Sequence, residues 1–490
     1  MSDKLKKARA HEKEVLQQIP GDQRPAFHMS SLVGWANDPN GFSLFNGEYH
    51  LFYQYHPYSI HWGPMHWGHY KSKDLIRWEA VPCAIAPDME YDGEGCFSGG
   101  ALEHEGRHYL MYTSVSKDPA TGKVRQTQSV AVGDGLNYEK LPQNPVMTGE
   151  MLPAGSSLED FRDPKVWKDG DIFYCVVGSR SDDTSGQMAL FKSQDMIHWE
   201  FASILDRSRN EYGKMWECPD FFFLDGVWVG LTFPQEMQAQ GLEFHNGNGN
   251  ICLMGSFNPE TCDFIREKIC AIDYGMDFYA GQSLLAPDGR RIMLAWMQNW
   301  ENYMTPADYQ WSGMMTIPRV LRVENGCLCQ TPVEEIKNYY TGDIIRTGKT
   351  SEEFQELEGI RGQVFDMTVT LDPEVCRNLE IRVGVEGRFY SSLQYKGKEG
   401  LFVTDRTYSG KPMDLLSTRT MELPEPGKRV EIRVLKDKYS VEVFVDGGRK
   451  VMTSLIYSPA NAEGIQFKGD GPFQVEFHPI QKDINGDLSL

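Results

Sequence analysis

The stretch Trp35-Ala36-Asn37-Asp38-Pro39-Asn40-Gly41 places an acidic residue directly before a proline. An Asn46-Gly47 pair follows it, and then the aromatic and β-branched run Tyr49-His50-Leu51-Phe52-Tyr53. Asn-Gly between such runs is the strongest short signal for a β-hairpin, because both residues tolerate the left-handed conformation that a two-residue turn requires. This part of the chain therefore predicts an acidic strand that leads into a hairpin.

Two later stretches have the same order of features. Phe161-Arg162-Asp163-Pro164 precedes the turn Asp169-Gly170, and Trp216-Glu217-Cys218-Pro219-Asp220 precedes the turn Asp225-Gly226. Two more turns open similar runs, at Glu105-Gly106 and Asp288-Gly289. The glycines of the five turns recur about every 60 residues, which indicates an internal repeat.

A repeat of about 60 residues made of short strands and turns is typical of one four-stranded blade of a β-propeller. Five copies fit, so the sequence predicts an all-β fold that begins with a five-bladed β-propeller. Asp38, Asp163 and Glu217 lie 9, 7 and 9 residues before their turn glycines. If each first strand runs uninterrupted to its turn, these odd offsets place the three carboxylates on the same face of their strands. They would then converge at the mouth of the central channel.

A simpler interpretation exists for each motif alone. An Asp-Pro or Asp-Gly pair is most often a solvated turn. Three acidic residues at a matched position, each within a motif that contains an aromatic residue or an arginine, favour a shared role instead. Carboxylates that crowd into a narrow channel repel one another and lose water, a cost that a scaffold tolerates mainly for chemistry.

At these residues the chain resembles glycoside hydrolase family 32, which contains invertases, β-fructofuranosidases, sucrose-6-phosphate hydrolases, levanases and inulinases. The three acidic motifs occur in the order typical of that family. The resemblance continues through four more stretches, Trp62–His69, Phe97–Gly99, Asp277–Gln282 and Trp311–Arg319. Val441–Gly448 also resembles a strand-turn motif of the family's C-terminal β-sandwich.

The resemblance implies a retaining hydrolase of β-linked fructofuranosides. Asp38 would be the nucleophile, Glu217 the acid/base, and Asp163, beside Arg162, the residue that grips fructosyl hydroxyls and stabilises the transition state. Retention independently requires two carboxyl groups about 5–5.5 Å apart, one ionised and one protonated. Crowding of three acids raises carboxyl pKa values, which gives a reason for Glu217 to hold its proton near neutrality.

The substrate pocket can be anticipated from residue types. A furanose carries many hydroxyls, so its recognition needs amide, hydroxyl and carboxylate partners together with an aromatic wall. The polar candidates, besides Asp163 and Arg162, are Asn37, Gln54 and Ser98. The aromatic candidates are Trp62, Phe97, Tyr279 and Trp296. For a single tryptophan in a β-rich protein, core packing remains the alternative.

Neither a metal nor a cofactor is expected. His56, His61, His66 and His69 lack the spacing of a helical histidine pair and have no interleaved acidic ligand. The ten cysteines contain no Cys-x-x-Cys pair, which argues against a zinc or redox motif.

Composition limits the partners and the compartment. A net charge of −20 disfavours nucleic acid and anionic membranes as partners, so we expect a small sugar as substrate, with a homo-oligomer possible. Residues 2–19 mix charged and polar side chains and contain no apolar secretion segment. The expected location is therefore the cytoplasm.

The chain divides into four expected parts: a helical extension over 1–25, the propeller over 26–330, a linker over 331–358, and a C-terminal β-sandwich over 359–490. The last part contains seven or more short alternating strands and the strong hairpin signal Asp446-Gly447-Gly448. It carries no evident catalytic residues, so we expect a supporting or oligomer-forming role.

The expected function is exo-acting hydrolysis of terminal β-D-fructofuranosyl residues in sucrose and short fructo-oligosaccharides. Hydrolysis of sucrose 6-phosphate is the main alternative, and a phosphate would need convergent cations. The available cations are Lys165, Arg180, Arg207, Arg209 and Lys214, each of which is by default a solvated surface residue. Two remote alternatives are an inverting arabinan- or xylan-cleaving hydrolase and a non-catalytic sugar-binding propeller.

Overall fold

The computed structural model describes residues 1–490 except 302–307, 411–414, 426, 428 and 487. In this part of the chain the predicted all-β fold is confirmed, because strands make up seven sheets. The helices are α1 (Asp3–Leu16) and the short 3-10 segments Gly21–Gln23, Glu90–Asp92, Gly149–Met151 and Glu334–Tyr339.

Five of the sheets are built from consecutive strands. The first contains β1 (Gly34–Phe45), β2 (Glu48–His56), β3 (His66–Ser72) and β4 (Glu79–Ile85), with β19 (Trp311–Ser312) beside β1. The second contains β5 (Gly95–His104), β6 (Arg107–Lys117), β7 (Val124–Gly133) and β8 (Tyr138–Lys140). The third contains β9 (Phe161–Asp169), β10 (Ile172–Arg180), β11 (Gly186–Ser193) and β12 (Trp199–Arg207).

The fourth and fifth sheets follow the same scheme. The fourth contains β13 (Met215–Leu224), β14 (Val227–Gln235), β15 (Ile251–Asn258) and β16 (Asp263–Ala271). The fifth contains β17 (Tyr279–Leu285), β18 (Arg291–Trp296), β20 (Arg319–Glu324) and β21 (Cys327–Pro332).

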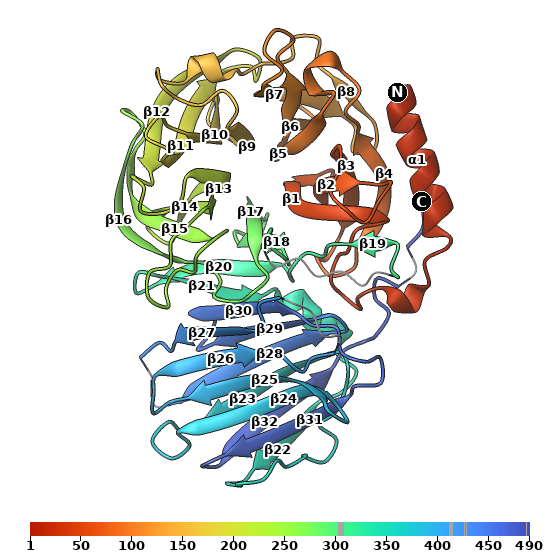
Figure 1. Ribbon diagram of the computed structural model, residues 1–490, viewed down its shortest axis with the longest axis vertical. Coiled ribbons are helices and arrows are strands. Elements are labelled where there is room, and N and C mark those ends of the chain that lie inside the picture. Colours follow the sequence, from red (N-terminus) through yellow and green to blue (C-terminus); the bar gives the residue numbers. More distant parts are fainter. Residues whose placement is uncertain (302–307, 411–414, 426, 428, 487) are drawn as a thin grey trace.

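The first strands of these five sheets lie at their common centre (Figure 1). They contact one another in the order β1, β5, β9, β13, β17, and β17 contacts β1 again. β19 pairs in parallel with β1, so a late segment of the chain is joined to the first sheet. The five first strands are therefore neighbours although they are far apart in the sequence.

The hairpins follow from local turn chemistry. Asn46 and Gly47 have φ values of 51° and 77° and connect Phe45 directly to Glu48 across the strand pair. Asp225 and Gly226, with φ values of 48° and 90°, occupy the corresponding turn between β13 and β14. Positive φ at both central residues matches the right-handed twist of the flanking strands.

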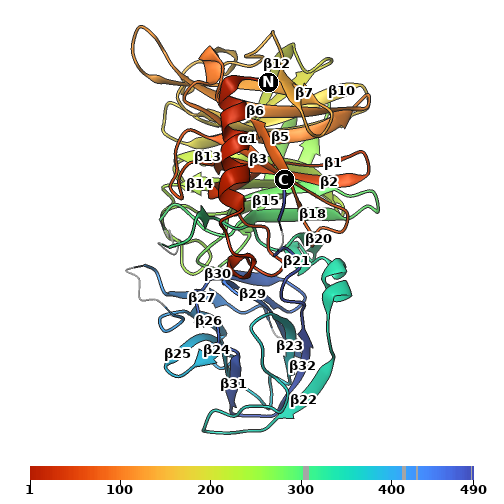
Figure 2. The same ribbon diagram turned by 90° about the vertical axis from the view of Figure 1, so that its right-hand side faces the viewer.

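The remaining two sheets pack face to face (Figure 2). One has the order β22 (Ile344–Gly348), β32 (Phe473–Pro479), β23 (Phe365–Leu371), β28 (Val430–Asp437), β29 (Ser440–Val445) and β30 (Lys450–Leu455). The other has the order β27 (Thr418–Glu422), β26 (Leu401–Asp405), β25 (Phe389–Lys396), β24 (Asn378–Glu386) and β31 (Gly464–Gly469). β22 falls within residues 331–358, which the sequence predicts as a linker, and pairs with β32.

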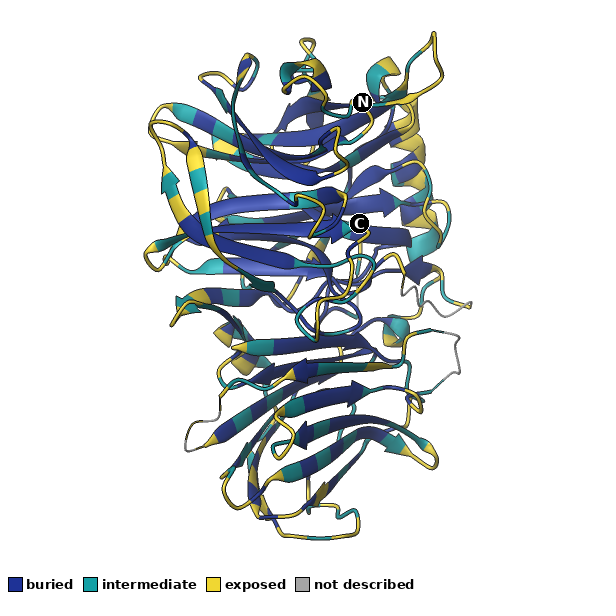
Figure 3. Cartoon of the chain, turned by 60° about the vertical axis from the view of Figure 1, so that its left-hand side comes forward, coloured by how far each residue is buried: buried dark blue, intermediate teal, exposed yellow. Residues whose placement is uncertain are grey.

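Burial explains why these segments form strands. The inward-facing residues of both C-terminal sheets, such as Val369, Ile381 and Phe467, are almost fully buried in one apolar core. In the five-sheet part, buried residues fill the central strands, and exposed residues concentrate at turns and edges (Figure 3). Burial of apolar area supplies most of the stabilisation of such an arrangement.

The N-terminal helix lies against the outer strand of the first sheet. Ser2 caps α1 by accepting a hydrogen bond from the Leu5 amide. Glu12 is fully buried and accepts a hydrogen bond from the Cys83 amide of β4. Among the described helices, none has the length and apolarity needed to span a membrane.

Candidate active site

The beginnings of the five central strands surround a cavity of about 310 Å³. Asp38 comes from β1, Ser98 from β5, Asp163 from β9 and Glu217 from β13. The full lining is Asn37, Asp38, Gln54, Trp62, Phe97, Ser98, Gln126, Arg162, Asp163, Glu217, Gln235 and Trp300. The structure thus brings the three acidic residues of the sequence motifs into one cavity.

Each central strand is irregular where it meets this cavity. In β1 two residues, Asn37 and Asp38, lie opposite the single residue Gln54 of β2. Similar register shifts occur at Ser98, at Asp163 and Pro164, at Cys218 and Pro219, and at Ala280 and Gly281. These β-bulges redirect side chains, so the carboxylates do not converge along the uninterrupted strands that the sequence analysis assumed.

Backbone strain accompanies three of these bulges. Asp163, Cys218 and Ala280 have φ values of 66°, 46° and 55°, in the left-handed region. Such conformations are costly for residues other than glycine and concentrate at functional sites. The strain at Cys218 lets its amide donate a 2.9 Å hydrogen bond to Oδ2 of Asp163, which joins β13 to β9.

Asp38 is held by a set of donors. Its Oδ2 accepts a hydrogen bond of 2.6 Å from the Ser98 hydroxyl, and its Oδ1 accepts one of 3.1 Å from the side-chain amide of Asn37. The Cys218 thiol lies 3.5 Å from Oδ2. Burial and the nearby Glu217 raise the pKa of Asp38 to about 6, although these donors favour the ionised form.

Asp163 is the most deeply buried of the three acids, at 5% exposure. Burial, the charge of Glu217 and the charge of Asp38 raise its pKa to about 7, while Arg162 opposes that shift. Asp38 and Asp163 therefore titrate closer to neutrality than ordinary aspartates, as expected where acids share a desolvated site.

Glu217 has a different environment. Its Oε1 accepts a hydrogen bond of 3.0 Å from Nε of Arg162, and its Oε2 accepts one of 2.6 Å from the Tyr279 hydroxyl. Its carboxyl group is thus oriented by one cationic and one neutral donor. Asp38 and Glu217 therefore have different hydrogen-bond partners.

Arg162 organises one side of the cavity. Its guanidinium also donates to Asp160 at 2.9 Å and, at 3.3 Å each, to the side-chain oxygens of Gln126 and Gln235. These two glutamines are not among the residues predicted from the sequence motifs. The position of Gln235 could have indicated its role. Gln235 is the last residue of β14, the second strand of its sheet, and the predicted residue Gln54 lies near the end of β2, the second strand of the first sheet.

The aromatic wall differs in part from expectation. Trp62, 50% exposed, stands edge-on to Phe97 with ring centroids 6.0 Å apart, and both line the cavity. Trp296 lies behind the wall, because it is fully buried and packs against Trp35 and Trp300. Trp300, which is not among the residues predicted from the sequence, lines the cavity in its place.

The three expected polar residues line the cavity, whereas the aromatic candidate Tyr279 reaches it from behind. Asn37, Gln54 and Ser98 line the cavity, and Gln54 also donates to the Cys96 carbonyl at 3.0 Å. Tyr279 is fully buried and reaches the site through its hydroxyl. Its ring packs against Phe233, which fixes the direction of the hydroxyl.

None of the five cations that the sequence makes available for a phosphate lines this cavity. Arg180 pairs with Asp160 at 2.6 Å, and Lys214 pairs with Glu236. Lys165, expected at the surface, is instead buried at 8% exposure. It lies two residues beyond Asp163, toward the other end of β9.

The clustered histidines have structural contacts. His56 and His66 each contact the Pro64 carbonyl through Nδ1, and His69 contacts His50. In the described ranges no group of three or more His, Cys, Asp or Glu residues is arranged to hold a metal. The ten cysteines are unpaired.

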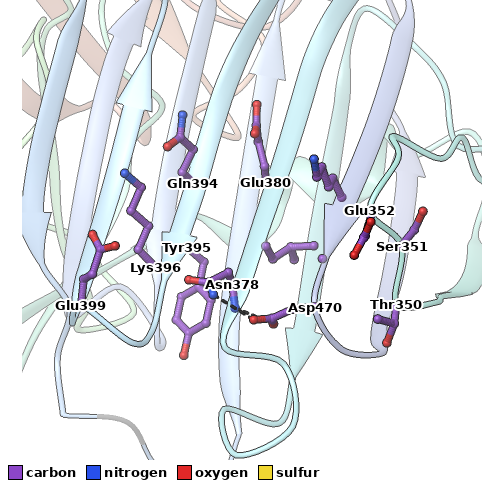
Figure 4. A pocket seen from close by; sticks show the side chains of 13 residues that line it. Thr350, Ser351, Glu352, Asn378, Glu380, Gln394, Tyr395, Lys396, Glu399 and Asp470 are labelled. Atoms are coloured by element: carbon purple, nitrogen blue, oxygen red, sulfur yellow. Dashed lines mark hydrogen bonds between the residues drawn. The ribbon is translucent and has the colours of Figure 1, made fainter.

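A second cavity, of about 400 Å³, lies on the C-terminal sheet formed by β24, β25 and β31 (Figure 4). Glu380, Gln394 and Lys396 rise from the sheet, and Asp470 accepts a hydrogen bond from the Asn378 side chain at its edge. Its acids do not have the mutual crowding and burial found at Asp38 and Asp163. The cavity of the five central strands is therefore the stronger candidate for the active site.

Models of known protein families match most of the chain. Residues 28–332 match the model described as the glycosyl hydrolases family 32 N-terminal domain, and residues 335–481 match that of the family 32 C-terminal. The chain belongs to glycosyl hydrolase family 32. The family predicted from the acidic motifs is confirmed, and the chain is a glycoside hydrolase.

Relatives of this family-32 member include two proteins of Escherichia coli. One, named sucrose-6-phosphate hydrolase, is 36% identical over 438 residues, which cover 88% of this chain and 89% of the relative. The other, named raffinose invertase, is 34% identical over 443 residues, which cover 89% and 90%.

Solved structures give the same relationship. The family-32 β-fructofuranosidase of Bombyx mori, as a variant in complex with sucrose, superposes with a TM-score of 0.85 at 32% identity and 98% coverage of both chains. The sucrose-6-phosphate hydrolase of Lactobacillus gasseri gives 0.84 at 25% identity, covering 98% of this chain and 96% of that one.

Proposed function

We propose that this family-32 enzyme is a retaining, exo-acting hydrolase that removes terminal β-D-fructofuranosyl residues from sucrose and short fructo-oligosaccharides. The observation that carries the proposal is the meeting of Asp38, Asp163 and Glu217 in one cavity, with Asp38 and Glu217 held by separate partners. The names of the E. coli and B. mori relatives support the substrate class.

Asp38 is the proposed nucleophile. In its ionised form it attacks the anomeric carbon of the fructosyl unit and forms a covalent ester, while the aglycone leaves. Ser98 and Asn37 fix the carboxylate and favour its ionised state. Their donors oppose the effect of burial, which keeps the group available as a nucleophile at mildly acidic to neutral pH.

Glu217 is the proposed acid/base. It protonates the leaving oxygen in the first step and removes a proton from the attacking water in the second. After the first step the carboxylate is stabilised by Arg162 and Tyr279. Asp163 is proposed to accept hydrogen bonds from fructosyl hydroxyls and to stabilise the positive charge that develops on the ring.

Substrate binding is proposed to use the rest of the lining. Asn37, Gln54 and Ser98 contact hydroxyls, and Trp62 and Phe97 contact the apolar face of the sugar. Arg162 and Tyr279 act mainly through Glu217, and Trp296 acts through Trp300. A cavity of about 310 Å³ suits one sugar unit at a chain end, which makes the action exo.

The proposed architecture is a five-bladed β-propeller followed by a β-sandwich. Support comes from five sheets whose first strands contact one another in cyclic order. We assign 1–25 to the N-terminal extension, 26–330 to the propeller and 359–490 to the sandwich. Residues 331–358 connect them and contribute β22 to the second unit. The sandwich is proposed to support the catalytic unit or to form oligomers.

The cytoplasm is the proposed location. Ten unpaired cysteines are consistent with a reducing compartment. In that compartment the enzyme would meet imported sucrose and short oligosaccharides rather than long fructans.

Sucrose 6-phosphate hydrolysis is the second candidate, favoured by the names of the E. coli and L. gasseri relatives. A panel of sucrose, sucrose 6-phosphate, 1-kestose and inulin separates the candidates through kcat/KM. A preference for sucrose 6-phosphate above about tenfold, or ~1.4 kcal/mol of transition-state binding, would replace the main proposal.

Two product analyses test the reaction itself. Methanolysis of sucrose should give the methyl β-fructoside, and the α product would indicate an inverting site of the arabinanase or xylanase kind. Early digestion of inulin should release free fructose. Mid-length oligosaccharides among the first products would contradict exo action, and absence of hydrolysis of every sugar in the panel would favour a binding protein.

A further inference from the structure

The ends of the five central strands surround a cavity separate from the active site. Its volume is about 600 Å³, and its lining includes residues from the ends of β1, β5, β9, β13 and β17. Because the beginnings of the same strands form the active site, the two cavities lie at opposite ends of the central strands. None of the proposed catalytic residues lines this rear cavity.

Lys165 forms part of its floor. The side chain is buried, and its Nζ donates to the Ser283 carbonyl at 2.5 Å and lies 3.7 Å from Asp220. Asp220 is already engaged, because it accepts hydrogen bonds of 2.8 Å from both the amide and the hydroxyl of Ser283. Burial lowers the pKa of Lys165, and the positive charge of Arg291 acts in the same direction.

Arg291, from the start of β18, forms the other part of the floor. Its guanidinium lies over the Phe222 ring, with its central carbon 4.4 Å from the ring centroid. Its Nε is buried and has no hydrogen-bond partner among the described residues. Within the same set of residues it forms no ion pair, and the influence of Asp220 is too weak to offset the burial that lowers its pKa.

The charges of this floor do not balance. Two cations, Lys165 and Arg291, face one carboxylate, that of Asp220, whose Oδ2 is satisfied by Ser283. At the rim, Lys168 is opposed by Glu103 and Asp169, but all three are exposed to water, which screens them. The half-buried guanidinium of Arg291 keeps one buried donor, Nε, without an acceptor among the described residues, and buried donors are normally paired with an anion or an ordered partner.

We propose that the rear cavity binds a phosphoryl group, either as free phosphate or as part of a small sugar phosphate. The planar guanidinium of Arg291 offers paired donors that match two phosphate oxygens, and Lys165 adds a compact positive charge. The volume exceeds that of phosphate alone. Trp228 and the exposed Phe223, which also line the cavity, provide apolar surface for a sugar ring.

The proposal does not depend on the fructosidase activity, so binding is measured directly on the full chain. Isothermal titration with inorganic phosphate, against sodium chloride at equal ionic strength, should show saturable binding that chloride does not reproduce. Phosphate should also raise the Tm of the wild type, since a ligand of the folded state stabilises it. Equal effects of phosphate and chloride would overturn the proposal.

Two neighbouring arginines provide a matched comparison. Arg291→Gln removes a charge that forms no ion pair among the described residues, and it should weaken phosphate binding at least about tenfold. Arg290→Gln removes a charge that pairs with Asp288 and Glu335 outside the cavity and should leave binding unchanged. Unchanged binding in Arg291→Gln would overturn the proposal, and so would an equal loss in Arg290→Gln.

Lys165→Met tests the second cation. It should also weaken binding, and if this variant does not fold, the Arg291→Gln result still decides the question. Titration with a hexose 6-phosphate distinguishes the two sources of the group. Binding tighter than that of phosphate assigns a sugar phosphate, and binding no tighter assigns free phosphate. In both cases Arg291→Gln must weaken the binding at least about tenfold, which excludes binding at the active site as its source.

Discussion

The hydroxyl of Tyr279 lies 2.6 Å from Oε2 of Glu217 and 2.9 Å from the Phe233 carbonyl. A phenol has one proton to donate, so the two contacts are alternatives. When Glu217 is ionised, Tyr279 donates to it. When Glu217 is protonated, Tyr279 can donate to the carbonyl and accept the carboxyl proton. One side chain therefore stabilises both protonation states that an acid/base must adopt.

Replacement of Tyr279 by phenylalanine should affect chemistry more than binding. A hydrogen bond to a charged group contributes about 1.5–3 kcal/mol, so kcat/KM for sucrose should fall by about tenfold to a hundredfold. Steady-state kinetics should place most of the loss in kcat. An effect confined to KM would mean that Tyr279 acts on substrate binding and not through Glu217.

Asp38→Asn should lower turnover by several orders of magnitude, because an amide cannot form the covalent intermediate. Sugar binding and the fold should persist, since Asn can still accept the hydrogen bond from Ser98. Turnover and fructose affinity, with circular dichroism as the control for folding, check this expectation. Turnover near that of the wild type would remove Asp38 from the mechanism.

Glu217→Gln should fail on sucrose but recover on a fructoside whose leaving group is already acidic, because that group leaves without a proton. Burst kinetics of such a substrate measure fructosyl transfer to the enzyme. Asp163→Asn should lose rate on both substrates, because its proposed contacts are with the fructosyl unit. Equal losses of Glu217→Gln on both substrates would assign Glu217 another role.

The limit of sequence-based prediction is visible at the central strands. Turn pairs such as Asn46-Gly47 were readable because a hairpin turn depends on its own residues. The bulge that turns Asp163 toward Glu217 was not, because a bulge depends on the register with a partner strand. Likewise Lys165 has a charged side chain of the kind usually found at the surface. It is buried because its strand, β9, lies between β5 and β13, the first strands of the two neighbouring sheets.

The aromatic residues show the same limit. Trp296 and Trp300 are close in sequence, and which of the two reaches the cavity depends on tertiary packing against Trp35. The strand β22 was missed because it is short and its partner, β32, lies more than 120 residues later. Local patterns therefore identified the acidic motifs, and long-range pairing decided the detailed lining.

The pH dependence of activity should report on Asp38. Burial and Glu217 raise the pKa of Asp38 to about 6, and the same two causes raise that of Asp163 to about 7. Activity as kcat/KM should therefore fall as pH decreases from about 7 through 6 and the two acids become protonated. The Ser98 hydroxyl favours the ionised form, so Ser98→Ala should move this acidic limb to higher pH. A pH profile of kcat/KM for both proteins measures the shift. An unmoved limb would mean that it belongs to another group.

A buried ionic network should make stability depend on His28. The imidazole contacts Asp437 at 2.9 Å and Glu442 at 2.8 Å, and Glu442 also pairs with Arg319 of β20, so the network connects the five-sheet part to the C-terminal sheets. Burial alone would lower the pKa of His28, but its two carboxylate partners raise it from 6.5 to about 9. His28 is therefore cationic in the folded protein at neutral pH.

Because the folded-state pKa is raised, the stabilisation by His28 is fully present below about pH 6.5 and is lost as pH rises through about 9. His28→Gln leaves buried carboxylates without their cation and should lower the free energy of unfolding by about 3–5 kcal/mol at pH 7. Denaturant titrations from pH 6 to 10 should show that the gap between wild type and variant narrows between about pH 6.5 and 9. His198→Gln, which removes an exposed pair with Asp195, should have little effect at any pH. A gap that stays constant from pH 6 to 10 would show that His28 is neutral in the folded state and contributes through packing alone.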